Sequence, residues 1–217
     1  MNTEIQNNIL KSNTSIVGIV CKDGIVMGAD RRATAGNIVM SKTEQKVHKI
    51  NDYLVICWTG GAADALLSAK IISAELRLKE LKTRSRPTIK EAANLIGMML
   101  YRSIRTPSMI PHIVGILAAG YNQDGTTELY TIEPAGGVYK VKEYDSNFSS
   151  GMPYILGLLE RQYKKDISVK EGIELAKECI KSSTQRDIGS GNGIDVFSIT
   201  KDSIKHAVSE EIVAEYK

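Results

Sequence analysis

Two hydrophobic patterns alternate along the chain. Residues 15–21 and 25–29 are almost continuously apolar, and Lys22-Asp-Gly24 between them is typical of a hairpin turn. Uninterrupted apolar runs of this length favour strands that are buried on both faces. The sequence therefore predicts a buried antiparallel hairpin after a polar, Asn-rich start.

Further along the chain, helical and strand-like periods follow each other in groups. Thr88-Ile-Lys-Glu91 and Ser168-Val-Lys-Glu171 are capping boxes, which mark helix starts. Because the helices come in pairs, the order argues against a doubly wound parallel sheet. We predict one α+β domain, a four-layer αββα sandwich of two antiparallel sheets. Its strands are expected at 15–21, 25–29, 46–50, 53–58, 112–121, 128–132, 137–143, 194–199 and 203–208, and its helices near 66–78, 88–104, 152–163 and 168–186.

Composition and charge narrow the class of protein. Of the 217 residues 42% are apolar, and the formal net charge is only +3. The sequence has no dense Lys/Arg run of the kind that would indicate a nucleic-acid or membrane partner. The first thirteen residues do not resemble a secretory signal. The three cysteines, Cys21, Cys57 and Cys179, lack metal-ligand spacing. Cys21 and Cys57 lie in apolar strand-like runs, which favours buried free thiols at these two positions. We expect a cytoplasmic protein without a cofactor or metal.

Thr14 stands where the polar start meets the first buried strand. Taken alone, a threonine there usually reflects only β-branched packing. Its importance comes from the motifs that follow it, which are Asp30-Arg-Arg-Ala-Thr34, Lys46-Val-His-Lys-Ile50, Thr59-Gly-Gly61, Ser149-Ser-Gly-Met-Pro-Tyr154 and Arg186-Asp-Ile-Gly-Ser-Gly-Asn-Gly-Ile-Asp195. From Thr14 to about Ile199, this series resembles that of proteasome β subunits of the archaeal type.

The resemblance implies an N-terminal-nucleophile hydrolase fold and a threonine endopeptidase. Residues 1–13 would be a propeptide that is removed autocatalytically, leaving 14–217 as one domain. Thr14 Oγ would then attack the scissile carbonyl, with the freed α-amino group, whose pKa is roughly 8, as base through a water. Lys46 would lower the pKa of that hydroxyl, and Asp30 would keep the lysine charged. The other implied residues are Gly60, whose N–H would donate to the oxyanion, and Asp187, Ser150 and Ser190, which would orient the amine and the water.

The resemblance also assigns residues to the substrate side. Arg32 and Thr34 would form a wall of the groove, with Thr34 pairing to the peptide backbone as an added strand. Trp58 is bulky and Glu44 is acidic, so we expect a shallower pocket that tolerates basic side chains. If Trp58 turns into the core instead, the pocket is unchanged. The residues implied near this pocket are Ala33, Glu44, His48, Trp58 and Ala62.

Several of these residues also have simpler interpretations. Asp30 and Lys46 could form a surface ion pair of little energetic value. Ser150 could be the N-cap of the helix that follows it. The segment Gly189-Ser-Gly-Asn-Gly193 could suggest a phosphate-binding loop, but it follows a helix and precedes a strand, which is the reverse of the P-loop order.

Residue 13 departs from the family pattern. Active members typically carry glycine before the nucleophile, because attack on the carbonyl of residue 13 requires a tight turn. Asn13 is the non-glycine residue that best tolerates positive φ, so we favour a processed, active subunit. The alternatives are a structural β subunit that keeps residues 1–13 and a different N-terminal-nucleophile amidohydrolase, against which the Thr–Lys–Asp set argues.

The resemblance implies a set of partners as well. An active subunit of this family would work inside stacked heptameric rings. The implied partners are proteasome α subunits, other β subunits, a regulatory ATPase that acts through the α ring, and unfolded polypeptide as substrate.

Overall fold

The computed structural model describes residues 13–212. Its strands form two five-stranded antiparallel sheets and a two-stranded ribbon. All of the predicted propeptide except Asn13 lies outside the described residues.

The first sheet has the order β10 (Tyr144–Asp145), β1 (Ile16–Cys21), β2 (Gly24–Asp30), β11 (Gly193–Ile199) and β12 (Ile204–Glu211). The second has the order β5 (Val47–Lys49), β6 (Leu54–Gly60), β7 (Val114–Tyr121), β8 (Thr127–Ile132) and β9 (Val138–Lys140), and the ribbon pairs β3 (Ala33–Ala35) with β4 (Ile38–Ser41).

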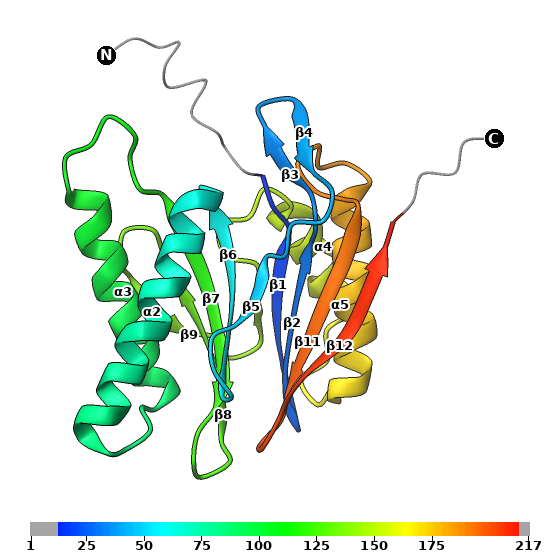
Figure 1. Ribbon diagram of the computed structural model, residues 1–217. Coiled ribbons are helices and arrows are strands. Elements are labelled where there is room, and N and C mark those ends of the chain that lie inside the picture. Colours follow the sequence, from blue (N-terminus) through cyan, green and yellow to red (C-terminus); the bar gives the residue numbers. More distant parts are fainter. Residues whose placement is uncertain (1–12, 213–217) are drawn as a thin grey trace.

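A pair of helices covers the outer face of each sheet (Figure 1). The second sheet carries α2 (Ala62–Thr83) and α3 (Ile89–Arg105), and the first carries α4 (Met152–Gln162) and α5 (Val169–Thr184). The predicted αββα sandwich is confirmed, as are both capping boxes. Among residues 13–212, no helix has both the length and the apolar composition needed to cross a membrane.

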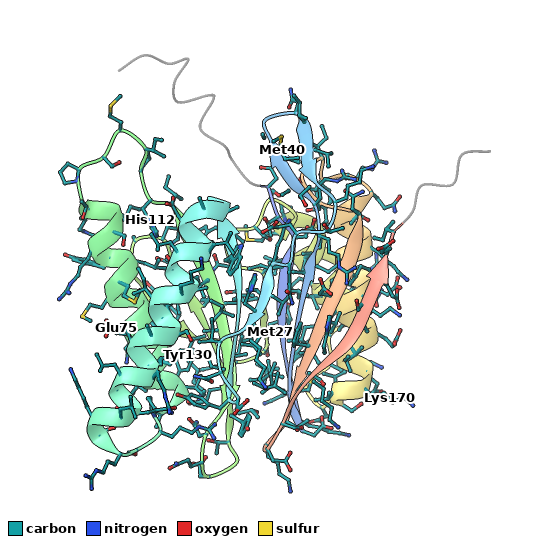
Figure 2. All side chains as sticks on the ribbon, viewed as in Figure 1. Met27, Met40, Glu75, His112, Tyr130 and Lys170 are labelled. Carbon is teal, nitrogen blue, oxygen red and sulfur yellow. The ribbon has the colours of Figure 1, made fainter. Side chains whose placement is uncertain are left out.

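Apolar side chains fill all three spaces between the four layers. Met27 lies between the two sheets, whereas Ile72 and Ile180 lie under the helices of the second and first sheets respectively. Figure 2 shows the contrast between Met27 in the interior and Met40 on the projecting β3–β4 ribbon. Both faces of the first hairpin are buried, which agrees with strands that are apolar except for Asp30 at the end of β2. Cys21 and Cys57 are buried and free, as predicted, and so is Cys179.

The sequence prediction was wrong in two places. It missed the ribbon of β3 and β4, whose second strand is largely exposed. It also expected one strand over 137–143, whereas β9 ends at Lys140 and β10 begins at Tyr144 in the other sheet. The chain passes from the second sheet to the first between these two strands.

Asn147 connects the two sheets near the end where β1 begins. It lies in the loop from β10 to α4, and its Nδ2 lies 3.2 Å from the carbonyl oxygens of both Ile116 and Ile132 and 2.9 Å from Thr131 Oγ1. Its backbone has a φ of 47°, in the left-handed region that asparagine tolerates better than most residues. Asn147 therefore attaches the loop that carries Ser150 to strands of the second sheet.

Replacing Asn147 should separate the side-chain contribution from the backbone contribution. Asn147→Gly keeps the left-handed backbone but removes the hydrogen bonds, so we expect a loss of about 1–3 kcal/mol in unfolding free energy. Asn147→Ala should lose about 1 kcal/mol more, because alanine is strained at positive φ. Urea unfolding of both variants measures this. Wild-type stability in both would show that the side chain does not hold the loop.

Candidate active site

The register of the first hairpin places Asp30 beside Ser15, the residue that follows Thr14. Ile16 pairs with Ala29, so the residues just beyond this pair, Ser15 and Asp30, also face each other. The backbone confirms this, because Asp30 N donates to Ser15 O over 3.1 Å. Asp30 is the last residue of β2 and lies beside the start of β1. These two strand ends lie at the upper end of the sandwich in Figure 1.

Asp30 is the most completely hydrogen-bonded carboxylate of the site. Its Oδ1 accepts from Ser15 N at 2.9 Å and from Lys46 Nζ at 2.8 Å. Its Oδ2 accepts from the backbone N–H groups of Arg32 and Gly191, both at 2.9 Å. Asp30 is 0% and Lys46 2% exposed, so the interpretation as a surface ion pair was wrong. These four donors offset the cost of removing the carboxylate from water.

The peptide bond between Asn13 and Thr14 is held from both sides. Lys46 Nζ donates to the carbonyl oxygen of Asn13 over 3.4 Å. On the other side, Thr14 N donates to Ser150 Oγ over 2.9 Å. Thr14 itself is 1% exposed. The lysine that pairs with Asp30 thus also contacts the carbonyl of the bond that the sequence predicts to be cut.

Asp187 organises a second network of hydrogen bonds. Its Oδ2 accepts from Ser150 Oγ at 2.6 Å and from Ser190 Oγ at 2.5 Å. Ser190 Oγ also lies 2.7 Å from Ser15 Oγ, and since Ser190 donates to the carboxylate, Ser15 must donate to Ser190. The alternative role of Ser150 as an N-cap was wrong, because α4 is capped at Gly151 without a side-chain bond. Ser150 instead connects Thr14 N to Asp187.

Gly60 ends β6 in a conformation that favours glycine. Its φ is 101°, and a Cβ atom there would overlap the carbonyl oxygen of Ile113. Helix α2 begins two residues later, so the partial positive charge of its N-terminus lies at this end of the sandwich. Both features suit a position where a negative charge develops on a substrate oxygen.

The substrate-side residues fall into two groups. Arg32 is bound to the loop after α5, with Nε donating to Asn192 Oδ1 at 2.8 Å and Nη1 donating to Ile188 O at 2.9 Å. Thr34 lies in β3, where its buried Oγ1 has no hydrogen-bond partner within residues 13–212. The second group contains the residues that the family resemblance places near the pocket for the side chain before the cut bond. Four of them are partly exposed, namely Ala33, Glu44, His48 and Ala62.

Trp58 belongs to the core rather than to an open surface. It is 2% exposed and packs among the residues between α2 and the second sheet. Its ring stacks on His48, with centroids 3.9 Å apart and planes at 13°. Burial lowers the pKa of His48, which favours the neutral ring for this stack. In this arrangement Trp58 offers almost no surface to a substrate.

Sequence reasoning missed three contributors to these networks. Ser15 extends the Asp187 network, Gly191 donates its N–H to Asp30, and Asn192 holds Arg32. The sequence did carry a local signal for Gly191 and Asn192. Their φ values are 152° and 65°, and glycine and asparagine are the residues that adopt positive φ most easily. No local signal marked Ser15, since its partner is 175 residues away.

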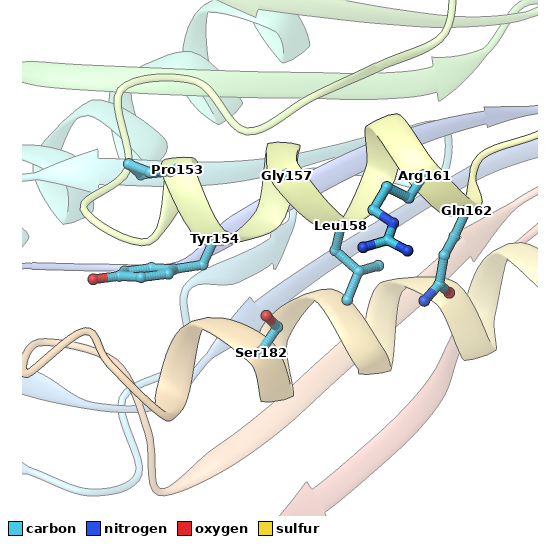
Figure 3. A pocket seen from close by; sticks show the side chains of 7 residues that line it. All are labelled: Pro153, Tyr154, Gly157, Leu158, Arg161, Gln162 and Ser182. Carbon is cyan, nitrogen blue, oxygen red and sulfur yellow. The ribbon is translucent and has the colours of Figure 1, made fainter.

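A separate shallow groove lies on the helical face, between α4 and α5 (Figure 3). It contains no residue predicted for catalysis or substrate binding. Its lining residues are Pro153, Tyr154, Gly157, Leu158, Arg161, Gln162 and Ser182.

Comparison with known proteins agrees with this architecture. The family model described as "Proteasome subunit" matches residues 10–199. Proteins named "Proteasome subunit beta" are 38% identical over 96% of this chain and 94% of the relative in Archaeoglobus profundus, and 37% identical over 97% of both chains in Ferroglobus placidus. The relative of that name in Nanoarchaeum equitans is 37% identical, over 88% of this chain and 95% of its own.

The four layers, with a threonine at the start of the first buried strand, define the N-terminal-nucleophile hydrolase fold. The chain belongs to the proteasome subunit family, as a β subunit of the core particle. The sequence resemblance is thereby confirmed.

Two substitutions should show how strongly the site depends on the Asp30 carboxylate. In Asp30→Asn an amide NH₂ replaces an oxygen and faces N–H donors, so we expect a loss of about 3–5 kcal/mol in unfolding free energy. Lys46→Met leaves the buried carboxylate without its counter-ion, but the three backbone donors of Asp30 remain, so the loss should be smaller, about 2–3 kcal/mol. Urea denaturation compares them. An equal loss in the two variants would show that Lys46, and not the backbone, stabilises the carboxylate.

Proposed function

We propose that this β subunit is a threonine endopeptidase that removes its own leader at Asn13–Thr14. The observation that carries the proposal is the position of Lys46, whose buried Nζ contacts both the Asp30 carboxylate and the Asn13 carbonyl. A cation between a carboxylate and a scissile carbonyl can stabilise an alkoxide and a developing oxyanion. A purely structural role for the ion pair would not require its lysine to contact the carbonyl of residue 13.

Maturation would begin with attack by Thr14 Oγ on the carbonyl carbon of Asn13. The hydroxyl proton passes to the Thr14 nitrogen as the C–N bond breaks, which leaves an ester and a free amine. Water then hydrolyses the ester, so that Asn13 ends in a carboxylate and Thr14 recovers its hydroxyl. The hydrogen bond from Thr14 N to Ser150 Oγ supports this course, because it orients the leaving nitrogen.

Peptide hydrolysis would reuse the same groups on a new carbonyl. The freed α-amino group of Thr14 takes the hydroxyl proton through a water, which a group with a pKa of roughly 8 can do near neutral pH. Lys46 favours the alkoxide, and the Gly60 N–H donates to the oxyanion. Asp187 and its two serine partners, Ser150 and Ser190, orient the amine and the water.

The substrate would bind as an extended strand beside Thr34 of β3. The short ribbon supports this mode, because β3 pairs only with β4 among residues 13–212, and an unpaired strand edge can bind a peptide backbone. The pocket for the side chain before the cut bond is assigned to Ala33, Glu44, His48 and Ala62. Trp58 would shape it only from behind, through the stacked ring of His48.

The proposed setting is a cytoplasmic particle with stacked heptameric rings. Its other members would be α subunits, further β subunits and a regulatory ATPase that delivers unfolded polypeptide. Large apolar side chains exposed in the isolated chain support association, since soluble proteins rarely leave such groups uncovered. They include Ile38 and Met40 on the ribbon and Met109 and Ile110 between α3 and β7.

Thr14→Ala should abolish both reactions. We expect assembled particles that retain residues 1–13 and hydrolyse peptides at least about 10³-fold more slowly, because the nucleophile is gone. Thr14→Ser is the control, since it keeps a hydroxyl and should still be processed. Intact-mass measurement and a fluorogenic peptide assay give the two readouts. A full-length wild-type chain in mature particles would instead identify a structural subunit.

The acidic residue Glu44 should influence which peptides are cut. If it borders the pocket, Glu44→Gln should lower kcat/KM for peptides with Arg before the cut bond by about 2- to 5-fold, the effect of one exposed charge pair. Peptides with Leu at that position serve as the control. A wild-type enzyme that strongly prefers large apolar residues, with no change in the variant, would contradict a role for Glu44.

A further inference from the structure

The side chain of Asn13 fills the space that a side chain at position 189 would need. A Cβ atom built on Gly189 would overlap Asn13 Cβ and would lie 2.7 Å from its Cγ and 2.8 Å from its Nδ2. The three atoms nearest to this position all belong to Asn13. Gly189 is buried and Asn13 is partly buried. Any side chain at position 189 would therefore compete with that of residue 13.

The backbone of Gly189 does not explain why glycine is present. Five glycines among the described residues have positive φ, including its near neighbour Gly191, and Gly189 is not one of them. Conformational freedom is therefore not what this position requires. Glycine matters here because it has no side chain, which leaves room for the side chain of Asn13.

The loop around Gly189 cannot easily move away from Asn13. Gly189 N donates to Asp187 Oδ1 over 3.1 Å, and the next residue, Ser190, donates to Oδ2 of the same carboxylate. Asp187 also accepts from Ser150, which holds Thr14 N. A displacement of this loop would therefore disturb the groups that hold the Asn13–Thr14 bond.

We propose that Gly189 is a positioning residue for cleavage of the Asn13–Thr14 bond. It provides the space that an asparagine side chain at position 13 needs, so the scissile carbonyl stays against Lys46 and within reach of Thr14 Oγ. This inference rests on the proposed autocatalytic function and deepens it. It also explains how a residue larger than glycine is accommodated before the nucleophile.

The consequence for the reaction is geometric. With alanine at 189, either the side chain of Asn13 or the loop must shift, and both movements carry the carbonyl carbon away from Thr14 Oγ. Misplacement of reacting atoms by about 1 Å can slow a reaction by roughly 10²-fold. With glycine at position 13 there is no side chain to displace, so alanine at 189 should then be tolerated.

A double-substitution series tests this directly. The subunit is assembled into particles with its α-type partner as wild type, Gly189→Ala, Asn13→Gly, and both changes together. Loss of residues 1–13 is followed by intact mass over time. Gly189→Ala should be processed at least about 10-fold more slowly than wild type, whereas the double variant should be processed as fast as Asn13→Gly. Gly157→Ala is the matched control, because a Cβ there meets no atom within 4 Å.

The outcomes separate this inference from the proposed function. Processing of Gly189→Ala at the wild-type rate would overturn the inference alone, because the wild type would still have been cleaved. A double variant as slow as Gly189→Ala would also overturn it, since the defect would then not depend on the side chain of residue 13. If the wild type itself retains residues 1–13, the proposed autocatalytic function fails.

Discussion

The buried ion pair between Lys46 and Asp30 is the interaction on which the rest of the site depends. Removing two charges from water costs several kcal/mol for each ion, so such a pair persists only when its hydrogen-bonding capacity is satisfied. Asp30 meets this requirement with donors from the start of β1, from Arg32, from Lys46 and from Gly191. Satisfying one carboxylate therefore brings four separate backbone segments to the same place.

The second carboxylate, Asp187, has a different character. It is partly exposed and bonds mainly to hydroxyl groups, which can change direction between donating and accepting. Such a network could follow the change that the proposed cleavage would make at Thr14 N, from an amide that only donates to an amine that also accepts a proton. The rigid Asp30 pair and the adaptable Asp187 network thus suit two different tasks, holding a charge and relaying a proton.

The sandwich makes this arrangement possible because it keeps the strand ends in register. Each of the three apolar layers holds neighbouring elements together, and the polar residues of the site collect at one end, where loops leave the sheets. Asn147 and Ser146 extend this connection, since they attach the loop before α4 to the second sheet and to Ile16 O. Membership of the proteasome subunit family agrees with a site built in this way.

The sequence by itself determined most of the elements and the layer order, and its family resemblance gave the residues proposed for catalysis, but it missed the β3–β4 ribbon and the break between β9 and β10. Hydrophobic period, capping boxes and turn residues act over a few positions, so they can be read locally, as both capping boxes show. Only the tertiary structure decided that Asp30 and Lys46 are buried, that Trp58 faces the core and that Gly189 adjoins Asn13. These facts depend on partners far apart in the chain, and packing rather than local preference determines which of them meet.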